Sequence, residues 1–206
     1  MPLELTENYI ARRLKEAYQP GVVASTDGYA ALATSQSGEK LTWAAVLMPL
    51  AWKEDEWHLL FTRRTNDVEH HKGQVSFPGG ACEADETAEQ TALREAEEEI
   101  GLQQADVRIL GQLNDVVTIT HYRVTPLVGV IPWPYEFYLA KIEVSRVFTI
   151  PLQWLMQREN WAEHNFTPEG TQRAFPVISY HPYDGEILWG ASARMTQNLL
   201  AVLHLQ

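Results

Sequence analysis

The chain has 206 residues, of which 45% are hydrophobic and 21% charged, and its formal net charge is −11. This length and composition are those of a globular protein that can bury a sizeable core. The acidic balance argues against a general nucleic-acid binder, because contacts to phosphate require Lys and Arg. A small anionic ligand is not excluded, since a bound cation can supply the missing positive charge.

The single cysteine, Cys82, cannot form an internal disulfide, so nothing indicates an oxidising compartment. The N-terminal stretch is mixed and charged, and it lacks the apolar region of a secretory signal. No segment approaches the roughly 18 consecutive apolar residues of a membrane span. We therefore expect a cytoplasmic protein that has no membrane partner.

The first half of the chain predicts one helix and a hairpin. Thr6 can cap a helix over residues 6–18, in which Ile10 and Leu14 recur at helical spacing. Residues 22–41 have no clear period and read as loop. The apolar runs 44–50 and 57–64 flank a charged tip and predict two paired strands. Pro49 indicates that the first of these strands is interrupted or lies at an edge.

The rest of the chain alternates between strands and helices. We expect an extended segment over residues 73–80, a helix at about 86–100, a short helix over 153–157 and an amphipathic helix from Ala191 onward. Further strands are expected at 107–113, 124–131 and 143–151, and a late hairpin should pair 175–180 with 186–190. The pattern predicts a mixed α/β protein. We divide it into residues 1–42, an N-terminal helix and loop, and residues 43–206, the main domain.

The helix at about 86–100 carries the strongest chemical signal. Glu95, Glu98 and Glu99 stand at positions i, i+3 and i+4, so their side chains project from one patch. Three carboxylates in such a patch repel one another unless a cation lies among them, and hard oxygen ligands favour Mg²⁺ or Mn²⁺. An acidic run on a helix is more often a solvated face. The shared patch, a preceding arginine and flanking glycines favour a metal site here.

The residues around this patch have their own expected roles. Ala88, Ala92, Ala96 and Ile100 form a row of small apolar groups that can press against a sheet. Arg94 can pair with Glu98, one turn later, or with Glu86 at the helix entry. Gly101 suits a left-handed helix end, and Gly79 and Gly80 let the backbone pass close to a ligand.

These residues together resemble the Nudix box, G-x5-E-x7-R-E-U-x-E-E-x-G-U. Every fixed letter is present, at Gly80, Glu86, Arg94, Glu95, Glu98, Glu99 and Gly101. The resemblance implies an α/β/α sandwich with a mixed β-sheet, in a single domain that hydrolyses a diphosphate linked to another moiety. It also implies that Glu95, Glu98, Glu99 and the Gly80 carbonyl bind Mg²⁺ or Mn²⁺, and that Glu86 and Arg94 hold the loop and helix together.

A second resemblance lies upstream, in residues 59–80. It is to the motif L-L-T-x-R-[SA]-x3-R-x3-G-x3-F-P-G-G of coenzyme A diphosphatases, and the matching residues are Leu60, Thr62, Arg64, Gly73, Phe77, Pro78, Gly79 and Gly80. Phe61, Thr65 and Glu69 depart from the motif, and Glu69 reverses the charge of its second Arg. The segments 118–131, 142–152 and 188–195 are also similar to that subfamily. The resemblance implies hydrolysis of coenzyme A or acyl-CoA.

The substrate contacts are assigned partly by strand geometry. Arg63 and Arg64 end a predicted strand, so only one of them can face a given pocket, and the family register favours Arg64. Arginine is suited to bidentate recognition of phosphate. Gln74 and His71 are also similar to residues of the subfamily. The aromatic residues cluster after strand 124–131 and could cover a base or a pantetheine arm, or simply pack: Trp133, Tyr135, Phe137 and Tyr138.

The general base has several candidates. Glu143 is the first choice, as an acidic residue that opens a strand outside the box, and it could instead be a further metal ligand. Glu98 is the second, and His121 and His71 are lesser ones. Three alternatives stay open: hydrolysis of ADP-ribose or a dinucleotide-type diphosphate, a catalytically weak ligand-binding regulator, and an acidic protein without metal. A homodimer is also open.

Overall fold

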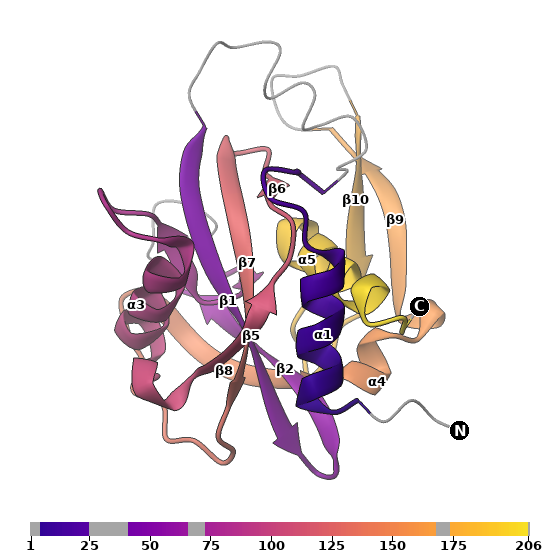
Figure 1. Ribbon diagram of the computed structural model, residues 1–206. Helices are drawn as coiled ribbons and strands as arrows, with labels where there is room; N and C mark the ends of the chain where they lie inside the picture. The colour runs from indigo at the N-terminus through magenta and orange to yellow at the C-terminus, as the bar shows by residue number, and fades with distance from the viewer. Residues whose placement is uncertain (1–4, 25–40, 66–72, 168–173, 206) are drawn as a thin grey trace.

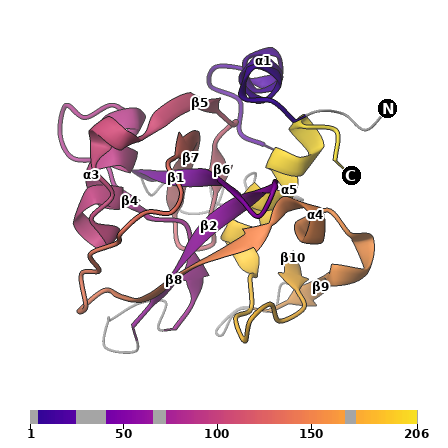
Figure 2. The same cartoon turned by 90° about the horizontal axis from the view of Figure 1, so that it is seen from below.

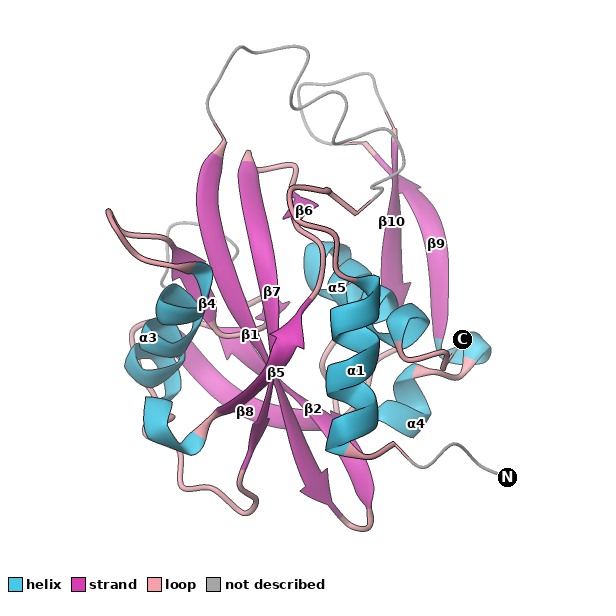
Figure 3. Cartoon of the chain, in the orientation of Figure 1, coloured by secondary structure: helices cyan, strands magenta, loops and turns pink. Residues whose placement is uncertain are grey.

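The computed structural model describes residues 5–24, 41–65, 73–167 and 174–205. Strands form a twisted sheet with helices on both sides, and a small two-stranded sheet lies beside it (Figures 1 and 3). The helices and strands, with the 3₁₀ turns labelled η, are α1 (Glu7–Ala17), β1 (Thr42–Lys53), β2 (Glu56–Arg64), β3 (Val75–Ser76), β4 (Gly79–Ala81), α3 (Ala88–Ile100), η1 (Gln104–Asp106), β5 (Arg108–Gln112), β6 (Val116–Val117), β7 (Tyr122–Ile131), β8 (Val144–Pro151), α4 (Leu152–Leu155), η2 (Arg158–Asn160), β9 (Trp161–Phe166), β10 (Phe175–Tyr180) and α5 (Gly190–Val202).

The main sheet is mixed and has β1 near its middle. Strand β1 pairs with β7 in parallel and with β2 and β4 in antiparallel orientation, and β2 also pairs with β8. The predicted hairpin of residues 44–50 and 57–64 is confirmed as β1 and β2, which meet at a tight turn beyond Lys53 and Glu56. Glu54 and Asp55 in that turn have positive φ, which suits a two-residue hairpin loop.

Pro49 does not lie on an edge strand, contrary to one of the two expectations for it. Strand β1 runs through it without a break, but its antiparallel partner changes there: Ala44–Val46 face β4, and Leu50–Lys53 face β2. The N–H of Leu47 bonds to the carbonyl of Pro78 on that side. Because N–H groups alternate along a strand, the Pro49 nitrogen faces the gap between β4 and β2, where no ladder donor is needed.

Two buried clusters fill the space between sheet and helices. One contains Ala92, Ala96 and Ile100 of α3 packed on one face of β1, and the other contains α1 and α5 packed on the opposite face. Figures 1 and 2 show α3 on one side of the sheet and α1 with α5 on the other. The predicted α/β/α arrangement with a mixed sheet in a single domain is confirmed.

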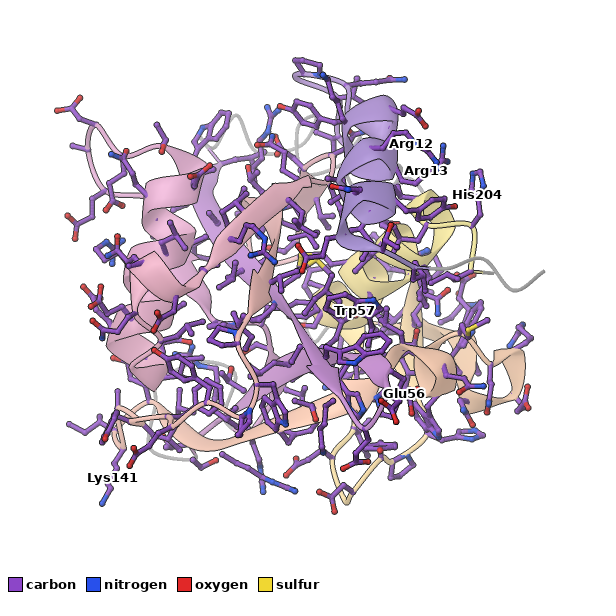
Figure 4. All side chains as sticks on the ribbon, turned by 60° about the horizontal axis from the view of Figure 1, so that its bottom comes forward. Arg12, Arg13, Glu56, Trp57, Lys141 and His204 are labelled. Atoms are coloured by element: carbon purple, nitrogen blue, oxygen red, sulfur yellow. The ribbon has the colours of Figure 1, made fainter. Side chains whose placement is uncertain are left out.

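Helix α1 is part of this packed unit. Thr6 caps it as predicted, and Ile10 and Leu14 are buried in the cluster beneath it. Arg13 donates to the carbonyl of Val202 and contacts His204 at the other end of the chain, and Figure 4 shows these side chains meeting. Strand β1 begins at Thr42, next to the expected boundary between residues 42 and 43.

The C-terminal part differs most from expectation. Strand β10 pairs along its length with β9, which the sequence pattern did not indicate. The expected partner, 186–190, makes only isolated bridges, such as that between Ser179 and Trp189. Four of the six residues of β9 are polar, alanine or histidine, with little period-2 contrast, so its pairing depends on β10. In the described residues, no helix is long and apolar enough to cross a membrane.

A buried histidine gives this fold a pH dependence. His58 on β2 is 2% exposed, and its Nδ1 lies 3.1 Å from the Thr149 hydroxyl. Burial lowers the pKa of His58 below its ordinary value of 6.5, and the charge of Lys53 lowers it further. Below pH 6.5 the unfolded chain therefore binds a proton that the folded protein does not, and the stability contributed by neutral His58 is lost as pH falls.

Between pH 7.5 and pH 5.5 the wild type loses the stability contributed by neutral His58 and His58→Leu does not, so we expect the free energy of unfolding to change more favourably in the variant. The raised pKa of Glu99 acts in the opposite direction and equally in both proteins. Urea unfolding at the two pH values checks this. His181 is exposed, so His181→Leu serves as the control and should keep the wild-type slope. Equal slopes for wild type and His58→Leu would contradict the assignment.

Candidate metal centre

Local sequence signals define both ends of α3. The Thr87 hydroxyl accepts from the Gln90 N–H while the Gln90 side chain accepts from the Thr87 N–H, which is a capping box. Gly101 ends the helix in the left-handed conformation, with φ 70° and ψ 17°. Three members of the predicted row, Ala92, Ala96 and Ile100, are 0% exposed, and the first, Ala88, is partly buried. This face fixes the rotation of α3, so its glutamates must project from the remaining surface.

Strand β4 brings backbone directly against one of these glutamates. A Cβ placed on Gly80 would lie 2.5 Å from Cδ and Oε1 of Glu95, so the carboxylate occupies the space that any side chain at position 80 would need. The neighbouring Gly79 has φ 157°, and a Cβ there would meet the Ala45 carbonyl at 2.3 Å. The two glycines therefore have different reasons to lack a side chain.

Arg94 joins the loop before α3 to the acidic patch. Its Nε donates to Glu86 Oε1 at 2.8 Å and its Nη2 to Glu86 Oε2 at 3.0 Å, a bidentate pair. Its Nη1 donates to Glu95 at 2.8 Å and to Glu98 at 3.2 Å. Glu86 also accepts from the Thr91 hydroxyl. Hydrogen bonding to Arg94 is the largest cause that lowers the pKa of Glu86, to about 2.

Glu99 is the most buried carboxylate of the patch. It is 4% exposed, and its Oε1 lies 3.6 Å from Nη1 of Arg64. Its Oε2 is buried and has no hydrogen-bond partner among the described residues. Burial raises the pKa of Glu99 to about 8, although the charge of Arg64 acts in the opposite direction. Burial likewise raises the pKa of Glu95. Burial is the largest cause of both shifts, and the negative charges of neighbouring glutamates add to it.

Glu143 lies close to the patch although it is distant in sequence. Its negative charge raises the pKa of Glu95 and of Glu99. The end of β2 holds it there: the Thr65 N–H donates to the Glu143 carbonyl at 2.8 Å, and the Thr65 hydroxyl donates to the Ile142 carbonyl at 2.6 Å. Thr65, which stands where the upstream motif has Ser or Ala, therefore makes a side-chain hydrogen bond that alanine could not make.

The other expected contacts are divided between two faces. Arg63 pairs with the buried Glu186 at 3.5 Å, so it points away from the acidic patch that Arg64 contacts. Gln74 lies next to Arg64, since its carbonyl accepts from the Arg64 N–H. His121 lies at the start of β7, where its carbonyl accepts from Thr42. His71 and Glu69 lie outside the described residues.

The aromatic cluster after β7 mainly packs. The Phe137 ring contacts both Trp133 and Tyr135, and all three lie against the cluster beneath α3. Tyr138 is 67% exposed. The backbone of this segment closes the C-terminal end of α3, because Tyr138 donates to the Ile100 carbonyl and Ala140 to the Glu99 carbonyl. These bonds place the segment that leads into Glu143 alongside the acidic patch.

The donor set suits a hard divalent cation. Glu95, Glu98 and Glu99 supply carboxylate oxygens, and the unpartnered buried Oε2 of Glu99 is an acceptor that a cation would satisfy. The three are not already gathered: in the described part of the chain no three His, Cys, Asp or Glu side chains converge as a metal cluster. Nη1 of Arg94 donates to both Glu95 and Glu98, and the Glu98 side chain is 61% exposed.

Two contacts that shape the acidic patch were not expected from the sequence: the one between Arg94 and Glu95, and the one from Thr65 to the backbone at Glu143. Glu95 is the residue next to Arg94, and neighbouring helical side chains usually diverge, so their 2.8 Å contact was not expected. The Thr65 tether depends on β2 and β8 lying together. A departure from a known motif at Thr65 was the only sequence signal for it.

The chain is similar to known proteins in sequence and in fold. Residues 41–169 match the model of the NUDIX domain. Proteins named Uncharacterized Nudix hydrolase NudL, from Yersinia pestis (strain Pestoides F) and Yersinia pseudotuberculosis serotype O:1b (strain IP 31758), are each 35% identical over 157 residues, which is 76% of this chain and 77% of theirs. The crystal structure of a MutT/nudix family protein from Enterococcus faecalis aligns with a TM-score of 0.52 over 96% of this chain and 78% of that one, at 15% identity, and shows likeness of fold.

Proposed function

The chain belongs to the Nudix hydrolase family, and from this premise we propose that it hydrolyses the diphosphate of coenzyme A or acyl-CoA. The products would be adenosine 3′,5′-bisphosphate and 4′-phosphopantetheine, or its acyl form. Hydrolysis of a diphosphate substrate is the activity of the family. The coenzyme A substrate is the part that this proposal adds.

We assign Glu95, Glu98, Glu99 and the Gly80 carbonyl as the groups that would hold Mg²⁺ or Mn²⁺. When bound, such a cation neutralises diphosphate charge and lowers the pKa of an attacking water. The chain's own contribution is positioning: Arg94 and Glu86 fix the loop to the helix, and Gly80 leaves room for the Glu95 carboxylate. Phosphoryl transfer depends mostly on such positioning and on charge stabilisation.

Glu143 is our candidate for the general base. It is exposed, so it can exchange protons with solvent, and it lies close enough to Glu95 and Glu99 to raise the pKa of both. Glu98 is the alternative. His121 is the weaker candidate, because it lies just before β7 and a lone histidine is more often merely hydrogen-bonded or solvated.

The observation that carries the coenzyme A proposal is the upstream motif together with the position of Arg64. Arg64 of the motif is the last residue of β2. Its guanidinium lies 3.6 Å from Glu99, within the acidic patch rather than on the outer surface. Phe61, which departs from the motif, is fully buried between Phe77 and Phe148, so this departure concerns packing. Arg64 is therefore suited to bind a phosphate of the substrate.

We expect kcat/KM for CoA to exceed that for dephospho-CoA and ADP-ribose by roughly tenfold to a hundredfold. Unlike these two compounds, CoA carries a 3′-phosphate, and a charge-assisted contact to such a group contributes about 1.5–3 kcal/mol, where each 1.4 kcal/mol is a factor of ten. A side-by-side panel with saturating Mg²⁺ measures this. A clear preference for ADP-ribose would remove the coenzyme A proposal and favour the ADP-ribose alternative. Binding of these compounds without turnover would favour a regulator.

A further inference from the structure

The contact between Arg64 and Glu99 is incomplete. The Nη1–Oε1 distance of 3.6 Å is longer than a hydrogen bond. Nε of Arg64 and Oε2 of Glu99 are both buried and have no hydrogen-bond partner among the described residues. The two opposite charges thus lie close together while one nitrogen of Arg64 and one oxygen of Glu99 make no hydrogen bond among the described residues, unlike the groups of a fully paired buried ion pair.

Each partner would be better satisfied by a different ligand. A buried carboxylate with a free oxygen gains from a divalent cation, and a guanidinium with a free Nε gains from a planar bidentate acceptor such as phosphate. The bulge in β8 helps to set this geometry. In the register of β2 with β8, Arg63 lies opposite Arg146 and Arg64 lies opposite Val144, so Ser145 is the extra residue of the bulge. The Ser145 hydroxyl donates to the Arg63 carbonyl.

We propose that Arg64 is an exchangeable counter-ion of Glu99. It neutralises this carboxylate in the free protein, and it leaves Glu99 for the substrate diphosphate once Glu99 becomes a metal ligand. Cation and diphosphate then bind cooperatively, because each removes the competitor of the other. This inference rests on the proposed function, since it takes Glu99 as a ligand and a diphosphate as the second partner of Arg64.

The first test measures Mn²⁺ affinity by electron paramagnetic resonance, without substrate. Arg64→Gln removes the competing charge and should tighten Mn²⁺ binding about tenfold, because a divalent ion close to a cation is repelled strongly in a partly buried site. Arg64→Lys keeps the charge and should bind Mn²⁺ within about twofold of wild type. Arg63→Gln is the matched control: it removes the same charge one residue earlier, from the pair with Glu186, and should also leave the affinity within about twofold.

Unchanged or weaker Mn²⁺ binding in Arg64→Gln would overturn the proposal, as would equal tightening in Arg63→Gln. Because no substrate is present, this experiment can fail while the CoA panel succeeds, and the CoA panel can fail while this experiment succeeds.

A second measurement uses the unmodified protein, in case Arg64→Gln does not fold. The ¹⁵Nε–H resonance of Arg64, assigned by its loss in Arg64→Lys, should shift and exchange faster with water as Mg²⁺ is added. An unmoved resonance at saturating Mg²⁺ would also overturn the proposal.

Discussion

Replacing Glu98 with glutamine is expected to lower kcat by a factor on the order of 10² to 10³, which corresponds to the loss of about 3–4 kcal/mol of transition-state stabilisation. The substitution keeps the shape of the side chain but removes a ligand charge from the acidic patch. The fold should be unaffected, because the Glu98 side chain is 61% exposed and its one described contact is with Arg94. Thermal unfolding in the absence of metal should therefore be close to that of the wild type.

The matched control for this variant is Glu97→Gln. It makes the same change one residue earlier, where the carboxylate accepts from the Gln104 side chain rather than from Arg94. Its kcat and Mn²⁺ affinity should stay within about twofold of wild type. Near-normal turnover of Glu98→Gln with saturating Mg²⁺ would contradict the metal assignment. Loss of activity in both variants would indicate that overall charge matters rather than position.

The second large effect is expected from alanine substitutions at two adjacent glycines. One should lower stability, and the other should lower metal affinity and kcat. In Gly79→Ala the new Cβ would lie 2.3 Å from the Ala45 carbonyl and 2.7 Å from Val46 Cα, both backbone atoms that cannot move without distorting β1. We expect a loss on the order of 3 kcal/mol in the free energy of unfolding.

In Gly80→Ala the three atoms nearest to the new Cβ all belong to the end of the Glu95 side chain, which can swing away. Stability should change by about 1 kcal/mol or less. The Glu95 carboxylate, however, would be displaced from β4, so Mn²⁺ affinity and kcat should fall by a factor of about 10². Urea unfolding separates the two variants, and Mn²⁺ titration and kcat measure the site. A stable Gly80→Ala variant with wild-type metal affinity would show that the Glu95–Gly80 contact is not part of the site.

The predictability of the fold follows the strength of local signals. Helix α3 was predictable because its cap, its row of small residues and Gly101 all lie within it and agree. The β1–β2 hairpin was predictable because two apolar runs flank a short charged turn. Strand β9 was missed because its residues are mostly polar and exposed, and the pairing with β10 alone makes it a strand.

The sequence by itself determined which residue types are gathered on α3, since spacing on a helix fixes which side chains share a face. It also determined that Arg63 and Arg64 face opposite sides, because side chains alternate along a strand. Tertiary structure decided which of them meets Glu99, and it brought Glu143 to the patch through Thr65. It also decided that Glu99 is buried and short of partners. Burial and long-range contacts depend on how β2, β4 and β8 pack around α3, and no local pattern records that packing.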